Sequence, residues 1–225
     1  MGEMFSRIAA RYDLMNGLMT LGMHHAWRRQ VARQSIPAPE GPLLDLATGT
    51  GDLALALREA HPHRLVVAAD FSIGMLREAE RKLAAVDPPP RVPLVAADAL
   101  ALPFGDRTFA CVTSAFLLRN LADLGRGLAE MKRVTRPGGR VVALEITQAR
   151  LPGFAPLFRV YFNRIVPRLG RLVSGDAEAY TYLPQSVEGF LGPEELRQAM
   201  QDAGLRGVSY RTTGMGTITI HTGIA

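Results

Sequence analysis

The sequence contains little cysteine and no long apolar run. Its one cysteine, Cys111, excludes an intrachain disulfide, and we expect a reducing compartment, the cytoplasm. No apolar run approaches the roughly 18 residues that cross a bilayer as a helix, so no membrane span is expected. Residues 1–12 carry charges and lack an apolar block with a cleavage site, which argues against a signal peptide.

Lysine is also scarce, so the positive charge is almost entirely arginine. Lys82 and Lys132 are the only lysines among 26 basic residues, and the net charge is +5. A basic chain attracts nucleic acid, anionic lipid or anionic ligands, but arginine-rich usage equally reflects genome composition. The interleaved aromatic and basic strand motif of RNA-binding domains is missing. We therefore expect no nucleic-acid partner.

Short apolar runs alternate with helical patterns from residue 43 onward, which predicts an α/β domain. The predicted strands are 43–47, 65–70, 92–97, 109–116 and 140–146. The predicted helices between them are 52–60, 72–86 and 123–134, with a turn at 136–139. Nearly continuous apolar strands separated by helices indicate a mostly parallel sheet covered on both faces. A last helix at 193–203 precedes strand-like runs at 207–213 and 217–222, which predict an antiparallel hairpin around residues 214–216.

Two helical segments flank this alternation within a single domain, residues 1–225. Residues 1–36 form a predicted N-terminal helical cap, with breaks at Gly17 and Gly22. Residues 148–190 are too long for an ordinary connection, so we interpret them as a helical lid. No acidic residue occurs between 150 and 175, where arginines alternate with apolar side chains at helical spacing. That pattern fits peripheral membrane contact through 148–175, or equally a helix packed on the core.

A glycine-rich loop, Asp45-Leu46-Ala47-Thr48-Gly49-Thr50-Gly51-Asp52, follows the first predicted strand. Glycines let the backbone approach a ligand, and the helix that begins there offers free N–H groups. Gly49, Thr50 and Gly51 are therefore candidate cofactor residues. Asp70, about twenty residues further on, suits a ribose diol, and Phe71 follows it. Dinucleotides and S-adenosylmethionine both contain that ribose.

Three aspartates favour S-adenosylmethionine over a nicotinamide dinucleotide. Asp45 lies inside the first strand, where a ligand ammonium would need an anion, and Asp52 at the helix start would repel a pyrophosphate. Asp98, with Ala99, ends the third strand, where a carboxylate can accept from the adenine amine. A nicotinamide-dependent oxidoreductase stays as the alternative. No metal site is expected, because the histidines lack metal-ligand spacing; they are His24, His25, His61, His63 and His221.

Four stretches together carry a family resemblance. They are Met4-Phe5-Ser6-Arg7-Ile8-Ala9 with Arg11-Tyr12-Asp13-Leu14-Met15-Asn16 and His24-His25-Ala26-Trp27; Phe116-Leu117-Leu118-Arg119-Asn120; residues 131–140 with Glu145; and residues 174–186. They resemble the C-methyltransferases of ubiquinone and menaquinone biosynthesis, which are class I S-adenosylmethionine-dependent methyltransferases. The glycine loop alone is unspecific, whereas residues 174–186 together with Arg119-Asn120 are highly specific. The resemblance covers essentially the whole chain.

The resemblance implies a Rossmann-like, mostly parallel seven-stranded sheet and S-adenosylmethionine as cofactor. It also implies methylation of a ring carbon of a prenylated quinol, either demethylmenaquinol or, as the alternative, a ubiquinone-pathway benzoquinol. Arg119 stays protonated, so we assign it to stabilising a phenolate or orienting a water, and Asn120 to a ring oxygen. Tyr12 and Tyr182 are candidate ring contacts, and a packing role stays open for each. The sequence leaves the oligomeric state open.

Overall fold

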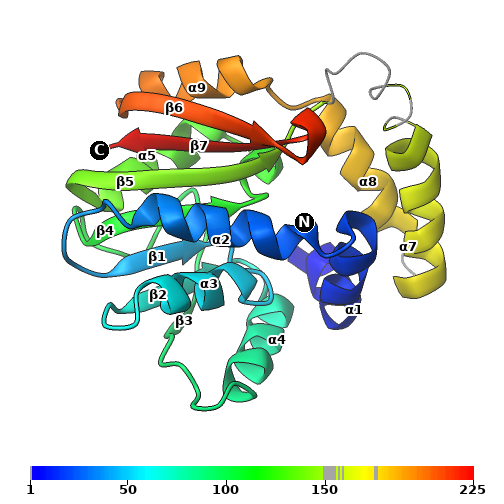
Figure 1. Ribbon diagram of the computed structural model, residues 1–225, viewed down its shortest axis with the longest axis horizontal. Helices are drawn as coiled ribbons and strands as arrows, with labels where there is room; N and C mark the ends of the chain where they lie inside the picture. The colour runs from blue at the N-terminus through cyan, green and yellow to red at the C-terminus, as the bar shows by residue number, and fades with distance from the viewer. Residues whose placement is uncertain (1, 149–155, 157, 159, 175–176) are drawn as a thin grey trace.

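The structure is a computed structural model that describes residues 2–148, 156, 158, 160–174 and 177–225 (Figure 1). A seven-stranded sheet with the order β3-β2-β1-β4-β5-β7-β6 forms its centre. The strands are β1 (Leu43–Leu46), β2 (Val66–Asp70), β3 (Leu94–Ala96), β4 (Phe109–Ala115), β5 (Thr135–Ile146), β6 (Arg206–Thr213) and β7 (Ile218–Ile224). Strands β1 to β5 pair in parallel, and β7 pairs antiparallel with β5 and β6. The predicted sheet and its C-terminal hairpin are confirmed.

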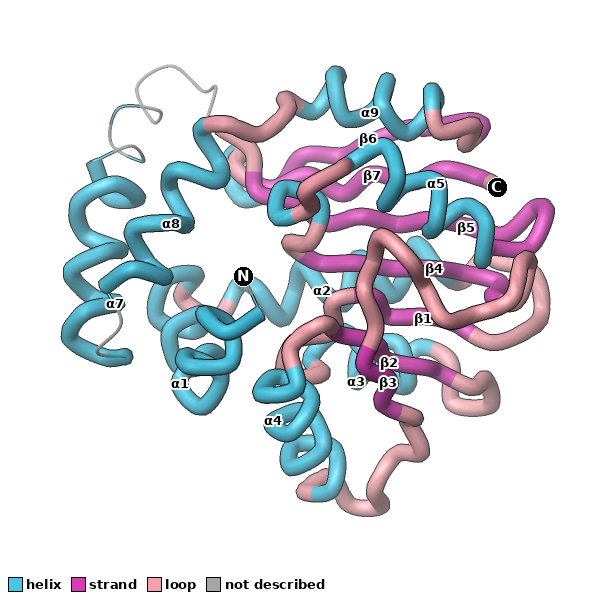
Figure 2. Tube along the Cα trace, turned by 180° about the vertical axis from the view of Figure 1, so that it is seen from behind, coloured by secondary structure: helices cyan, strands magenta, loops and turns pink. Residues whose placement is uncertain are grey.

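Helices cover both faces of this sheet. On one side lie α2 (Met23–Ser35) and α3 (Asp52–Ala60), and on the other lie α5 (Leu124–Val134) and α9 (Pro193–Asp202) (Figures 1 and 2). Adjacent side chains of β4 pack on opposite faces of the sheet. Cys111 packs in the core with α2 and α3, and Val112 packs in the core with α5 and α9. Both are fully buried. Because successive strand residues face opposite sides, a sheet covered twice requires the unbroken apolar run that predicted this strand.

A third apolar cluster lies at one end of the sheet, beyond the carboxyl ends of the parallel strands. It joins α1 (Gly2–Thr20) and α4 (Ile73–Ala84) to a helical segment, which comprises η2 (Tyr161–Ile165), α7 (Val166–Ser174) and α8 (Ala177–Glu188). Figures 1 and 2 both place α1, α7 and α8 side by side at that end. The buried members come from segments far apart in the sequence: Ile8, Ala9, Met15, Met75, Phe162, Val166 and Val187.

Two local predictions were wrong. Helix α1 continues through Gly17, and the chain breaks at Leu21 and Gly22, which have φ of 49° and 75°. A glycine inside a helix weakens it without having to end it. The predicted turn at 136–139 belongs to β5, where it bulges: Thr135 pairs with Phe109 and Arg140 with Cys111. Of the basic amphipathic pattern, Arg150, Phe154, Leu157 and Arg159 lie outside the described residues.

The contact between α1 and α4 can be tested with a pair of helical glycines. A Cβ at Gly74 would lie 2.8 Å from the Ser6 Cα, whereas a Cβ at Gly17 would meet nothing within 4 Å. We expect Gly17→Ala to raise the free energy of unfolding by about 0.5–1 kcal/mol through helix propensity. Gly74→Ala should lower it by about 1–3 kcal/mol, because α1 must move. Urea denaturation measures both, and equal effects would contradict the close approach of the helices.

Candidate active site

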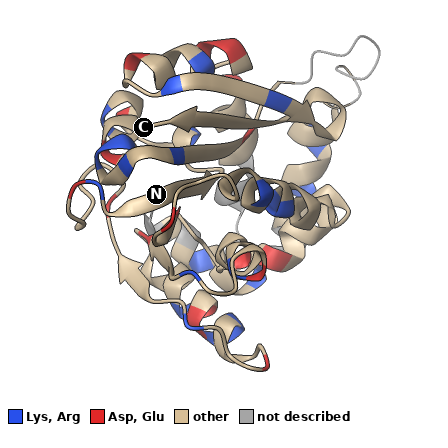
Figure 3. Cartoon of the chain, turned by 60° about the vertical axis from the view of Figure 1, so that its left-hand side comes forward, with Lys and Arg blue, Asp and Glu red and all other residues tan. Residues whose placement is uncertain are grey.

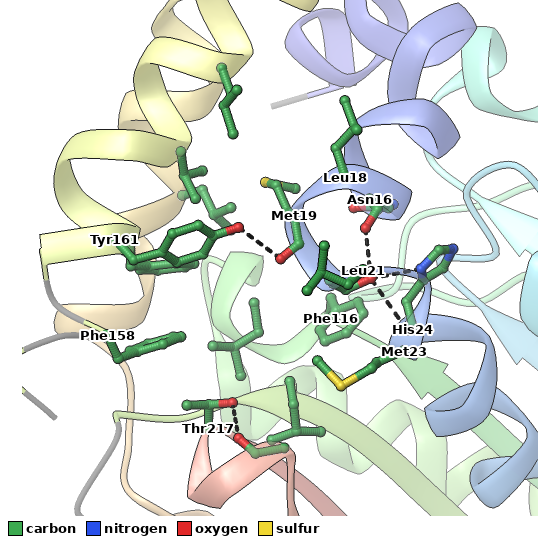
Figure 4. A pocket seen from close by; sticks show the side chains of 18 of the residues that line it. Asn16, Leu18, Met19, Leu21, Met23, His24, Phe116, Phe158, Tyr161 and Thr217 are labelled. Carbon is green, nitrogen blue, oxygen red and sulfur yellow. Dashed lines mark hydrogen bonds between the residues drawn. The ribbon is translucent and has the colours of Figure 1, made fainter. Parts of the chain in front are cut away.

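Two cavities lie at the carboxyl ends of the strands and meet at a pair of aromatic rings. The first, of about 320 Å³, is enclosed by the segments that follow β1, β2, β3 and β4, and we call it the strand-end cavity. The second, of about 570 Å³, lies between α1, α2, η2, α7 and the turn η3 (Gly214–Gly216), and we call it the apolar cavity (Figure 4). Tyr12 and Phe116 line both cavities. Molecules held in the two cavities would therefore meet beside these rings.

The carboxylate of Asp70 ties together the two loops that border the strand-end cavity. Its Oδ2 accepts from the Gly49 N–H and its Oδ1 from the Ser72 N–H, each at 2.8 Å. Burial raises the pKa of Asp70, and the N–H groups of Ser72, Gly49 and Phe71 oppose that rise. A carboxylate has about four acceptor positions, so these N–H groups do not use its full capacity. The sequence predicts that Asp70 binds the ribose hydroxyls, and this carboxylate can accept from a ribose.

Phe71, Asp98 and Ala99 also line the strand-end cavity. The Phe71 ring is 65% exposed, which leaves a face free to stack on a planar ligand group. Asp98 is exposed, and its Oδ1 accepts from the Leu100 N–H at 2.9 Å, so its other oxygen is available to an amine. These positions suit the base end of an adenosine.

Two further predicted cofactor residues, Thr50 and Gly51, lie away from the lining of the strand-end cavity. The Thr50 hydroxyl donates to Asp13 Oδ1 at 2.6 Å and accepts from Lys82 Nζ at 3.1 Å. Gly51 has φ of +88°, and a Cβ there would lie 3.4 Å from the Ala79 Cβ. Thr50 thus connects the glycine loop to α1 and α4, and Gly51 allows α3 to start close to α4.

Asp45 is fully buried and does not line the strand-end cavity. The Thr48 hydroxyl donates to its Oδ2 at 2.6 Å, and Thr113 Oγ1 lies 3.4 Å from its Oδ1. Burial raises the pKa of Asp45 to about 7, against the opposing effects of these hydroxyls and of the Arg28 charge. Asp45 would therefore influence a cationic ligand through its charge at a distance, without direct contact, and only while it is ionised.

A buried ion pair stands at the apolar cavity, in the turn η1 (Leu118–Asn120). Arg119 Nη1 donates to Glu145 Oε2 at 2.9 Å, and the Leu118 N–H donates to Glu145 Oε1 at 2.6 Å. Their side chains are only 7% and 1% exposed. Burial raises the pKa of Glu145, while the Arg119 charge lowers it. The Arg119 guanidinium also lies 5.5 Å from the centre of the Phe116 ring.

Asn120 connects η1 to α8. Its Nδ2 donates to the Phe116 carbonyl at 2.9 Å, and its Oδ1 accepts from the Tyr182 hydroxyl at 3.0 Å. Asn120 lines the strand-end cavity, and Tyr182 the apolar cavity. Phe116 itself has φ of 64°, a strained value for an aromatic residue. The sequence analysis gave no role to Phe116 or Glu145, and only their positions in the fold reveal one.

Comparison with known proteins identifies the family of this chain. The model of the ubiE/COQ5 methyltransferase family matches residues 1–225. The chain belongs to this family. A demethylmenaquinone methyltransferase of Roseiflexus castenholzii is 46% identical over 99% of this chain and 92% of its own length. The protein of that name from Thermus thermophilus is 47% identical over 98% of this chain and 99% of its own length.

Solved structures support the fold of this methyltransferase. An S-adenosylmethionine-dependent methyltransferase from Aquifex aeolicus superposes with a TM-score of 0.67 at 17% identity, covering 95% of this chain and 98% of its own. A possible histamine N-methyltransferase from Thermotoga maritima gives a TM-score of 0.66 at 18% identity, covering 99% and 98%. At such identities the likeness concerns the fold alone, and it confirms the predicted class I architecture.

The cofactor of this methyltransferase is S-adenosylmethionine, as the sequence predicted in preference to a nicotinamide dinucleotide. The strand-end cavity fits it: Asp70 has spare acceptor capacity for the ribose, and Phe71 and Asp98 suit the base. The buried Asp45 lies close to Thr48, where its charge favours a cation. When bound, the cofactor supplies an electrophilic methyl group on a sulfonium.

A cluster of His24, His25 and Asp52 has potential ligand atoms within 4.8 Å of one another. Its charges do not suit a metal ion, because Asp52 already pairs with two cations. Lys82 Nζ lies 2.6 Å from Asp52 Oδ1, and Arg28 Nη1 lies 3.4 Å from Oδ2. Burial lowers the pKa of His24 to about 4, so this imidazole is neutral and adds no charge to the cluster. We interpret the cluster as part of an ion-pair network beneath the glycine loop.

The raised pKa of Asp45 makes a prediction about stability. The folded protein holds this proton up to about pH 7, whereas the unfolded chain releases it near 3.8. Stability is therefore lost as pH rises through that window. Asp45→Asn mimics the protonated acid, so its Tm should exceed that of the wild type at pH 8 and match it near pH 4. Asp202→Asn, at an exposed position, serves as control. A Tm difference between Asp45→Asn and the wild type that does not change with pH would refute the raised pKa.

Proposed function

We propose that this methyltransferase methylates a ring carbon of a prenylated quinol, with demethylmenaquinol as its substrate. The observation that carries the proposal is the apolar cavity of about 570 Å³, which adjoins the cofactor cavity at Tyr12 and Phe116. The names of the Roseiflexus and Thermus relatives favour demethylmenaquinol. A Desulfotalea psychrophila relative, 41% identical, is named a ubiquinone/menaquinone biosynthesis C-methyltransferase, so a benzoquinol is the second candidate.

Arg119 would favour the reactive form of the ring. A quinol hydroxyl resembles that of tyrosine, whose pKa is about 10, so the neutral form prevails near pH 7. Arg119 cannot accept the proton, because its guanidinium stays charged, so a water molecule oriented by Arg119 would take it. The positive charge of Arg119, held in place by Glu145, favours the phenolate. The phenolate makes the adjacent ring carbon electron-rich, which methyl transfer requires.

We further propose that the helical segment from 148 to 190 acts as a lid, as the sequence suggested. Two tyrosine hydroxyls support this role by joining the segment to the rest of the site. Tyr161 donates to the Met19 carbonyl at 2.9 Å, and Tyr182 donates to Asn120. Phe158 and Phe162 stack at 5.2 Å on the cavity wall. Such a lid would exclude water from the reaction and hold the prenyl tail.

The rim of the apolar cavity supports contact with a membrane, where a prenylated substrate resides. Leu21 is 86% exposed and Met215 57% exposed, and both line the cavity. They have φ of 49° and 55°, so two strained turns present apolar side chains to solvent. The lid also has two exposed arginines, Arg164 and Arg168, which would meet anionic head groups. The membrane contact would thus include the α1–α2 turn and η3 as well as residues 148–175.

Within the described part of the chain, no helix has both the length and the hydropathy needed to cross a bilayer. Basic and acidic residues are interspersed in the view of Figure 3, so the net charge of +5 is not gathered into one broad basic face there. The apolar rim, more than the overall charge, would therefore position the protein on lipid.

The proposed function is tested by incubating the protein with S-adenosylmethionine and a panel of demethylated, chemically reduced naphthoquinols and benzoquinols. Mass spectrometry should detect a gain of one methyl group on the naphthoquinol ring. Methylation of the benzoquinol alone would select the second candidate. Cofactor binding without methylation of any quinol would refute the proposal.

The role of Arg119 gives a further prediction. We expect Arg119→Ala to lower kcat by about 100-fold while cofactor affinity by calorimetry stays within about twofold, because the lost charge acts on the ring. Arg119→Lys should recover only part, since the planar fork is lost. Arg119→Gln with Glu145→Gln avoids an unpaired buried charge and should still be slow. The exposed Arg211→Ala is the control. A parallel loss of cofactor affinity would place Arg119 at the cofactor instead.

The rim of the apolar cavity gives a prediction about membrane binding. Leu21→Asn and Met215→Asn remove apolar side chains at backbone positions that asparagine tolerates well. Each should reduce binding to anionic phospholipid vesicles, measured by sedimentation, by about 5- to 10-fold. Leu65→Asn removes a leucine that is 46% exposed and lies outside the lining of both cavities, so vesicle binding should persist. Equal losses in all three variants would contradict a specific rim.

A further inference from the structure

Two residues that line the apolar cavity have a buried N–H group for which no described residue provides a hydrogen-bond acceptor. The groups are Asn16 Nδ2 and Arg119 Nε. Buried donors are nearly always satisfied, because an unpaired one destabilises the folded state. Most of the other side chains around them are apolar, so the missing acceptor is expected on a ligand.

Asn16 is well placed to meet a ring that lies beside Tyr12. The two residues are one helical turn apart on α1, so they share a face, with their Cβ atoms about 5–6 Å apart. Tyr12 borders both cavities, whereas Asn16 borders only the apolar one. A ring whose reacting carbon lies at the Tyr12–Phe116 junction would therefore bring its neighbouring oxygen within reach of Asn16.

The polar groups around Asn16 are already engaged with each other. The Thr20 hydroxyl donates to the main-chain carbonyl of Asn16 at 2.7 Å, and His24 Nδ1 lies 2.8 Å from the same hydroxyl (Figure 4). Thr20 has one hydroxyl proton, so His24 Nδ1 must be the donor in that second contact. These bonds stabilise the last turn of α1 and the start of α2. Among the described residues, they leave the Asn16 amide nitrogen without a partner.

We infer that Asn16 is a catalytic residue, whose amide donates a hydrogen bond to the quinol oxygen beside the reacting carbon. The inference rests on the proposed function. Together with Arg119, Asn16 would bind the ionised oxygen more strongly than the neutral hydroxyl, because a hydrogen bond to an anion is the stronger one. Arg119 in η1 supplies charge, and Asn16 in α1 supplies a directed hydrogen bond. Asn16 would thus select a ring that has an oxygen next to the methylated carbon.

Two variants of the full chain test this role. Asn16→Asp keeps the shape but removes the donor, and Asn16→Leu removes both polar atoms. With a short-tailed demethylnaphthoquinol kept reduced by dithionite, both should lower kcat by about 10- to 100-fold. The rise of kcat with pH should move to higher pH, while S-adenosylmethionine affinity by calorimetry stays within twofold. Gln198→Glu, an amide-to-acid change at an exposed position of α9, should behave as the wild type.

Stability provides a readout that a purely structural role would not reproduce. Because Asn16→Leu removes an unpaired buried donor, its Tm should equal or exceed that of the wild type although its kcat falls. A kcat within twofold of wild type in either variant would overturn the inference. So would a lower Tm for Asn16→Leu, or an equal loss of cofactor affinity. If the wild type itself fails to methylate the quinol while it binds cofactor, the proposed function is wrong instead.

Discussion

The buried carboxylate of Glu145 is the group on which the junction of the two cavities depends. Glu145 stands at the end of β5 and accepts from η1, the turn that follows β4, through Arg119 and the Leu118 N–H. This contact holds the ends of two adjacent strands together where the cavities meet. It places Phe116 between the cavities and Asn120 beside Tyr182 of α8. Removing the carboxylate would therefore disturb the cofactor wall, the substrate wall and the lid contact together.

A second set of polar contacts connects the N-terminal helix to the cofactor loop. Asp13 of α1 accepts from Thr50 and pairs with Lys82 of α4, while Ser6 and Ser72 share a hydrogen bond of 2.8 Å. Because α1 also forms a wall of the apolar cavity, order in the glycine loop and order in the substrate wall are linked. An enzyme that must exclude water from a reactive methyl group benefits when one bound molecule helps to shape the site for the other.

Much of the fold and part of the site could be predicted from local patterns. The strand and helix alternation, the glycine loop and the strand-end carboxylates of Asp70 and Asp98 follow from periodicity and from the rule that parallel strands end at one edge. Errors arose where local signals were ambiguous: Gly17 is compatible with a continuing helix, and the glycines at 138–139 can serve a bulge as well as a turn. Thr50 and Asp45 were placed in the right loop, but which way their side chains face was not visible.

What the sequence determined by itself is the α/β order and the position of the cofactor loop, because these depend on spacing within short stretches, and the family, through the resemblance of four stretches to known methyltransferases. The tertiary structure alone decided which distant residues meet. Arg119 donates to Glu145, which is 26 positions away in the sequence, and Tyr182 donates to Asn120, which is 62 positions away. It also decided that Phe116 borders both cavities, that Asp45 is buried with Thr48 as its partner, and that no described residue accepts a hydrogen bond from the Asn16 amide. Burial and pairing of this kind arise only when several elements pack, so no local pattern records them.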